Sequence, residues 1–123
     1  MLQAIWVPGW HPTPLNKLTA GVNPFAANRL KQADCQTIDT AVKVSGVTFA
    51  EQKRRVDLHL SFPKGRRSCD KDAYWKSCLD SLVKAGVLVN DSAAWCEPGA
   101  VHYFKTHGEG DMWGTMILLE DRP

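Results

Sequence analysis

Long apolar runs are missing from this chain of 123 residues. No stretch reaches the roughly 18 apolar residues that a membrane-spanning helix needs, so the sequence predicts no transmembrane segment. The first twelve residues, MLQAIWVPGWHP, have neither a basic start nor a long apolar run. We therefore expect no signal peptide and a cytoplasmic, intracellular protein.

Closely spaced metal ligands are also missing. The four cysteines stand 34, 9 and 18 residues apart, and no two of the four histidines form an HxxxH pair. Zinc ribbons and fingers take their ligands in pairs roughly two to four residues apart. We therefore expect free thiols, buried or half-buried, rather than a structural zinc site.

Neither charge nor hydrophobicity is extreme. Charged residues make up 23% of the chain and hydrophobic residues 44%, which is typical of a globular protein rather than a disordered one. A chain of this length is long enough to bury one core without disulfides. We take residues 1–123 as a single domain.

The hydrophobic pattern predicts strands alternating with helices. Residues 54–62 alternate apolar and polar side chains, as in a strand with one buried face. Other strands are expected at 2–7, 101–105 and 112–120, helices at 28–44 and 68–85, a proline-rich loop at 8–28 and a hairpin loop at 107–110. This order predicts an α/β (α+β) fold in which a small mixed sheet packs with two main helices.

Positive charge is concentrated in the first part of the chain. Residues 1–76 carry twelve basic and six acidic side chains, whereas residues 77–123 carry three and seven. A basic patch attracts the phosphates of nucleic acid, although a solvated strand end and loop has the same composition. The candidate DNA contacts are the basic residues Arg54, Arg55, Lys64, Arg66 and Arg67, with Lys17 and Trp10 of the proline-rich loop.

Three carboxylates are the candidate catalytic groups. Asp70 and Asp72 follow a basic turn at a predicted helix start, and Lys76 lies one turn further on. Asp91 follows the helix and returns to its start only if residues 87–89 run back alongside it. Converging carboxylates need a counter-charge, and Mg²⁺, or Mn²⁺ in its place, prefers oxygen ligands. Such a metal site can activate water to attack a phosphodiester.

The same acids also have a purely structural interpretation. Asp70 and Asp72 suit the first turn of a helix, and Asp91 suits a turn after Asn90. An i, i+4 series of alternating charge forms a solvated helix face, and it comprises Asp72, Lys76, Asp80 and Lys84. That interpretation predicts a small structural or partner-binding protein.

The ordered set of residues resembles the RusA family of Holliday junction resolvases. The matching positions run without a gap through Asp70 and Asp72, Lys76, Asp80 with Leu82, Ala85-Gly86, and Asn90-Asp91. The flanking alternating strand and basic turn agree, and the loop from His11 to Lys17 is similar to the family's proline-rich loop. The resemblance is strongest over roughly residues 54–120.

The resemblance implies a bacterial or phage-encoded, Mg²⁺-dependent endonuclease that acts as a homodimer on four-way junctions and related branched DNA. It assigns the metal to Asp70, Asp72 and Asp91 and an essential positive charge to Lys76. Three positions depart from the family pattern: Ala73 where Asn is usual, Asn90 where Asp is usual, and Cys69. These departures keep open an alternative, a catalytically inactive junction-binding module of the same fold.

Overall fold

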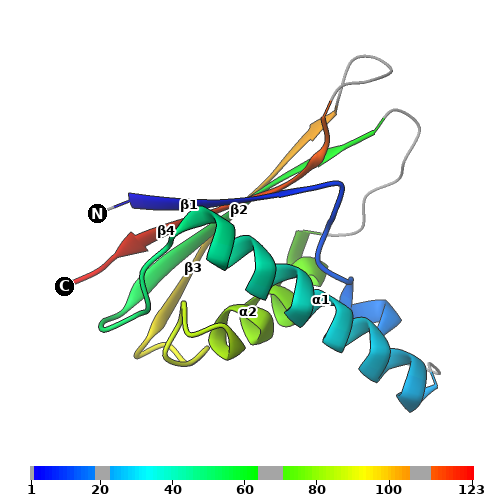
Figure 1. Ribbon diagram of the computed structural model, residues 1–123, viewed down its shortest axis with the longest axis horizontal. Coiled ribbons are helices and arrows are strands. Elements are labelled where there is room, and N and C mark those ends of the chain that lie inside the picture. Colours follow the sequence, from blue (N-terminus) through cyan, green and yellow to red (C-terminus); the bar gives the residue numbers. More distant parts are fainter. Residues whose placement is uncertain (1, 19–22, 64–70, 106–111) are drawn as a thin grey trace.

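A four-stranded mixed sheet and two α-helices form an α+β fold, as the sequence predicts (Figure 1). The computed structural model describes residues 2–18, 23–63, 71–105 and 112–123. Its strands are β1 (Leu2–Pro8), β2 (Arg54–Phe62), β3 (Cys96–Lys105) and β4 (Gly114–Asp121). Its helices are α1 (Pro24–Ser45) and α2 (Trp75–Lys84), with short 3-10 turns η1 (Leu15–Lys17) and η2 (Lys71–Tyr74).

The strand order is β1-β4-β2-β3, so the last strand of the chain lies inside the sheet. β4 pairs antiparallel with both β1 and β2, whereas β3 pairs parallel with β2. The predicted hairpin at 107–110 is therefore wrong as a pairing, because β2 separates the two strands that this loop joins. Residues 106–111 themselves lie outside the described residues.

The alternation predicted for residues 54–62 is confirmed by burial. Val56, Leu58, Leu60 and Phe62 are buried, and the residues between them are half-buried. Both helices cover the same face of the sheet, so the buried side chains of β2 meet a single core (Figure 1). Core residues from other elements include Ile5, Ile38, Leu82 and Ile117.

Both helices begin elsewhere than predicted. α1 begins four residues early, at Pro24, because the side chain of Asn23 accepts a hydrogen bond from the Phe25 N–H (2.8 Å) and caps the helix. α2 begins at Trp75, and the 3-10 turn η2 precedes it. The predicted cap Ser68 lies outside the described residues. None of the described helices is long and apolar enough to cross a membrane.

The outer face of the sheet carries a stack of aromatic rings. The ring centroid of His59 lies 4.7 Å from that of His102 and 5.7 Å from that of Phe104, and both ring pairs are stacked. His59 is half-buried rather than fully exposed on the polar face of β2. Its neighbours decide how it titrates.

The pKa of His59 makes stability depend on pH. Burial and the nearby charge of His102 lower this pKa below the ordinary 6.5, against an opposing effect of Asp57. The unfolded chain therefore takes up the proton at higher pH, so the free energy of unfolding falls as pH drops through about 6.5. Between about pH 7.5 and 5.5 we expect the melting temperature to fall more steeply in the wild type than in His59→Gln. Parallel curves for the two proteins would contradict this assignment.

Candidate functional site

Asp72 lies on η2, the 3-10 turn that leads into α2. Its side chain is exposed, and no hydrogen bond or ion pair joins it to another described residue. Two aromatic contacts seat η2 on the sheet: the ring of Tyr74 packs at right angles to that of Tyr103, and Lys71 Nζ lies 5.4 Å from the centroid of the same ring. The carboxylate of Asp72 can therefore bind a ligand, and it lies near the end of the β2–β3 pair at which Phe62 ends β2. Its predicted partner Asp70 lies outside the described residues.

Lys76 is on the first turn of α2, one turn beyond Asp72. Its Nζ lies 3.5 Å from Asp80 Oδ2, and the two side chains are 54% and 36% exposed. This contact is the i, i+4 pairing that the structural interpretation expects. An exposed pair of this kind holds its partners weakly, so Lys76 can be recruited by a phosphate at little cost.

Asp91 lies at the opposite end of α2 from Asp72. It follows the buried residues Val87 and Leu88, which contact the core instead of returning along the helix. The turn that contains Asp91 leads to Cys96, the first residue of β3, whereas η2 contacts Tyr103 further along that strand. Seven residues of β3 span roughly 23 Å. A single chain therefore does not bring Asp91 to Asp72.

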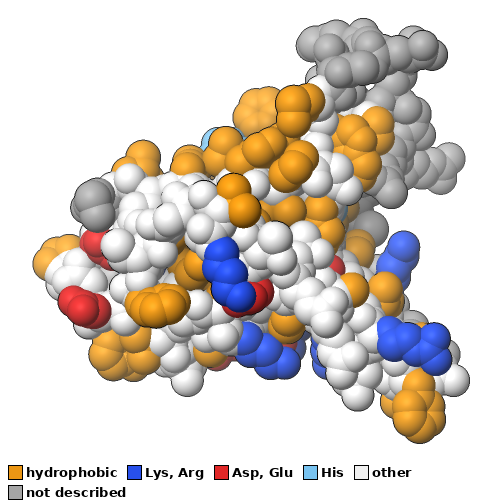
Figure 2. Space-filling model, in the orientation of Figure 1, with side chains coloured by type: hydrophobic (Ala, Val, Ile, Leu, Met, Phe, Trp, Pro, Cys, Tyr) orange, Lys and Arg blue, Asp and Glu red, His pale blue; other side chains and the backbone are white. Residues whose placement is uncertain are grey.

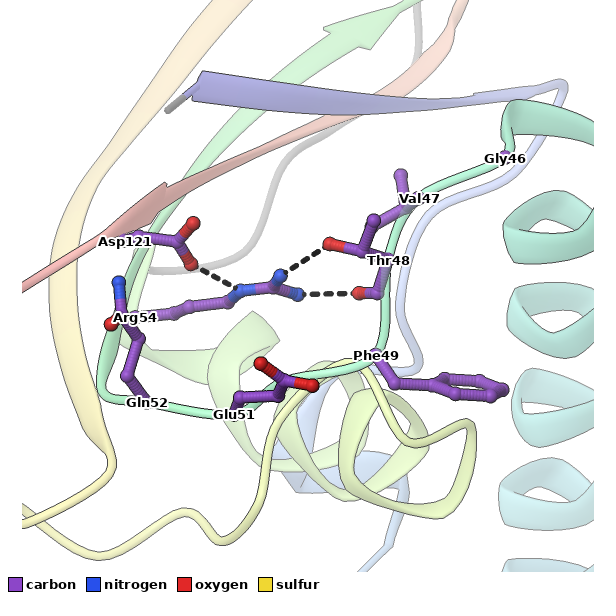
Figure 3. Close-up of a pocket in the computed structure, with 8 residues that line it drawn as sticks. All are labelled: Gly46, Val47, Thr48, Phe49, Glu51, Gln52, Arg54 and Asp121. Carbon is purple, nitrogen blue, oxygen red and sulfur yellow. Dashed lines mark hydrogen bonds and ion pairs between the residues drawn. The ribbon is translucent and has the colours of Figure 1, made fainter.

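Arg54 is buried and does not offer a contact to DNA, which corrects the sequence-based assignment. Its guanidinium donates to Asp121 Oδ1 (2.8 Å), to the carbonyls of Thr48 (2.8 Å) and Val87 (3.0 Å), and to Thr48 Oγ1 (2.8 Å). Figure 3 shows the side chain clamped between the loop before β2 and the end of β4. The physical reason lies in the strand period: Arg54 is in phase with Val56 and so faces inward.

The open cavity beside this arginine, about 730 Å³, is lined by the loop at residues 46–52 (Figure 3). Its size alone does not make it a binding site. Four of the five guanidinium N–H groups already bind the chain itself, so Arg54 has little left for an anion. We interpret this region as a structural clamp.

The other predicted DNA contacts differ in exposure. Arg55 is half-buried on the outer face of the sheet, where its Nε lies 3.1 Å from Asp57 Oδ2. Lys17 is exposed at the end of η1. On the face drawn in Figure 2, the described Lys and Arg side chains are scattered rather than gathered in one patch. Lys64, Arg66 and Arg67 lie outside the described residues.

Trp10 is half-buried, and a hydrogen bond holds its side chain in place. Its indole N–H donates to Asp34 Oδ1 (3.1 Å), and the other oxygen of Asp34 accepts from the Thr13 N–H (2.9 Å) and the Ser77 hydroxyl. Asp34 is only 4% exposed. This buried carboxylate ties the proline-rich loop to both α1 and α2. In the sequence, the only signal for this role is that Asp34 stands at helical spacing among apolar residues.

A cavity that sequence reasoning missed lies next to η2. It has a volume of about 330 Å³ and is lined on several sides by aromatic rings, including those of His11 and Trp113. The two residues are about a hundred positions apart in the sequence. The only local signals were the segments Trp10-His11-Pro12 and Met112-Trp113 beside strand ends, which do not indicate a shared cavity.

The donor set suits a hard divalent cation. Asp72 and Asp91 are exposed carboxylates, and oxygen ligands are what Mg²⁺ and Mn²⁺ prefer. Among the described residues no three His, Cys, Asp or Glu side chains cluster. Cys35, Cys78 and Cys96 are free thiols, as expected, and Cys69 is not described.

Comparison with known proteins does not identify a family for this chain. No protein-family model matches the chain. A search of curated proteins finds no match either.

Proposed function

We propose that this protein is a Mg²⁺-dependent, structure-selective endodeoxyribonuclease of the RusA type, which resolves Holliday junctions and related branched DNA during recombination and repair. The observation that supports it most is the ordered set Asp70, Asp72, Lys76 and Asp91 in the family's spacing. The structure adds that Asp72 and Lys76 are exposed and lie one helical turn apart.

The residues divide the chemistry between them. The carboxylates of Asp70, Asp72 and Asp91 are the proposed ligands, and the Lys76 ammonium is the proposed partner of the charge that develops on the scissile phosphate. Bound Mg²⁺, or Mn²⁺, supplies the Lewis acid and the activated water for hydrolysis. Cleavage leaves a 5′-phosphate and a 3′-hydroxyl.

The position of Asp91 makes a second copy of the chain part of the proposal. Asp72 and Asp91 lie at opposite ends of α2, so a site with both needs Asp91 from another chain. A two-fold dimer satisfies this requirement twice, because each copy offers the same two surfaces to its partner. Such a dimer also matches the approximate two-fold symmetry of a four-way junction, whose two opposed strands are cut.

One local contact favours the alternative, an inactive junction-binding module. Asn90 stands where the family has a second acidic residue, and its Oδ1 accepts a hydrogen bond from the Ser92 N–H (2.9 Å). A side chain engaged in a turn of this kind has a structural role. Ala73, half-buried on η2, also lacks the amide that is usual there.

Lys76→Ala should abolish cleavage and leave the fold unchanged. Removing a charge that stabilises a transition state typically costs roughly a hundredfold to a thousandfold in rate. Lys43→Ala is the matched control, because Lys43 is also an exposed lysine in an i, i+4 pair, with Asp39 on α1. Single-turnover cleavage of a four-way junction measures both. Equal loss of rate in the two variants would point to non-specific charge instead.

The proposal as a whole is tested by incubating wild-type protein with a labelled synthetic four-way junction, with and without Mg²⁺. Paired symmetric nicks that need the metal support the resolvase. Salt-sensitive junction binding without nicking in Mg²⁺ or Mn²⁺ supports the inactive module. Neither binding nor cleavage overturns both and favours the structural interpretation of the acids.

A further inference from the structure

The aromatic cavity beside η2 is open to solvent and is lined by segments that are distant in sequence. The proline-rich loop, the end of β2, η2 and the residue before β4 each contribute to it. The side chains that matter for its chemistry are Trp10, His11, Lys17, Phe62, Tyr74 and Trp113. Its volume of about 330 Å³ is at the small end of the range for ligand sites.

The walls of this cavity are fixed by packing and hydrogen bonds. The His11 ring lies 4.3 Å from the Phe62 ring and 4.9 Å from the Trp113 ring, measured between centroids. His11 Nε2 donates to the Ser61 carbonyl (2.7 Å), since a carbonyl oxygen only accepts. On the other side, Asp34 holds Trp10 and Thr13. A planar ligand would therefore enter a cavity that is already formed.

The charge and position of the cavity suit a nucleotide. Lys17 is exposed at the edge, where it can reach a phosphate while a ring lies inside. Tyr74 lines the cavity and belongs to the same 3-10 turn as Asp72. A base that enters this cavity therefore belongs to a DNA strand that passes the proposed site of cleavage.

We propose that this cavity accepts one unpaired nucleobase from the branch point of the DNA, with the adjacent phosphate on Lys17. The inference rests on the proposed function and adds the feature of the substrate that is recognised. A paired base cannot enter, because its faces are stacked and its edge is occupied. Stacking on aromatic side chains is worth about 1–3 kcal/mol per base, so a junction with an unpaired base gains on the order of tenfold in affinity.

The test uses two four-way junctions in EDTA, one fully paired and one carrying a single unpaired 2-aminopurine at the branch point. Wild-type protein should bind the second about tenfold more tightly and quench its fluorescence by stacking. Trp113→Leu should lose both effects and still bind the paired junction. Trp6→Leu is the control, because Trp6 is half-buried on β1 and does not line the cavity.

A second pair of variants protects the test against misfolding of Trp113→Leu. Lys17→Ala changes an exposed side chain and should reduce the preference for the unpaired base, whereas Lys43→Ala, which removes an exposed lysine outside the cavity, should not. Unquenched 2-aminopurine, or no preference in the wild type, overturns the base-binding role. If wild-type protein still nicks the paired junction in Mg²⁺, that failure leaves the nuclease intact. Failure to bind either junction overturns the nuclease and the base pocket together.

Discussion

Replacing Asp72 by Asn should abolish Mg²⁺-dependent junction cleavage and leave junction binding intact. The substitution keeps the size of the side chain and removes the negative charge that a cation needs. Because a bound metal contributes several kcal/mol of transition-state stabilisation, we expect the single-turnover rate to fall by roughly two to four orders of magnitude. Binding in EDTA should be unchanged or slightly tighter, because one repulsive charge towards phosphate is gone.

Asp39→Asn provides the control for this experiment. The side chain of Asp39 is also accessible to solvent, being 51% exposed, but it lies on α1, where its Oδ2 pairs with Lys43 Nζ at 2.9 Å. The variant has the same change in net charge and should cleave like the wild type. Wild-type cleavage by Asp72→Asn would remove Asp72 from the metal site and with it the central premise of the proposed mechanism.

Of the substitutions considered, replacing Arg54 by Ala should lower the free energy of unfolding the most. The side chain is 2% exposed and its hydrogen bonds join the loop before β2, the segment after α2 and the end of β4. Its removal leaves Asp121 and two carbonyls without their donor. Breaking a buried ion pair in this way costs about 3–5 kcal/mol. Thermal unfolding should show a fall in melting temperature on the order of 10–20 °C.

The neighbouring Arg55→Ala is the matched control. Arg55 lies on the outer face of β2, and its pair with Asp57 is partly exposed to solvent. Its removal should change the melting temperature little. If Arg55→Ala weakens DNA binding and Arg54→Ala does so only through unfolding, the two arginines have the separate roles that their burial indicates. Equal melting temperatures for the two variants would contradict the role of Arg54 as a structural clamp.

The sequence predicts what depends on local periodicity and misses what depends on partners far along the chain. Alternation in residues 54–62 identifies the buried face of β2, and the same alternation places Arg54 inside, although its charge suggested a surface role. A turn-like loop at 107–110 suggested a hairpin, but which strand pairs with β4 is decided by non-local packing. The Asn23-Pro24 pair was a readable helix start.

The candidate site shows the same division. Asp72 and Lys76 lie four residues apart, so their positions on successive turns could be predicted from helix geometry. The place of Asp91 depends on the route of residues 87–89, and Val87 and Leu88 are buried in the core instead of forming a returning strand. The aromatic cavity requires His11 and Trp113 to meet beside the ends of the neighbouring strands β1 and β4, which no local pattern encodes.

The position of β4 has a consequence for the synthesis of this protein. Both antiparallel pairings in the sheet involve its last strand, β4. Its partners come from two earlier parts of the chain: Leu2 pairs with Glu120, and Arg54 pairs with Asp121. Until residues 114–121 emerge from the ribosome, β1 and β2 present unpaired backbone edges to solvent or to other nascent chains. Folding must therefore wait for translation of the C-terminal strand. A product truncated before Gly114 leaves the backbone edges of β1 and β2 unpaired, and such edges promote aggregation.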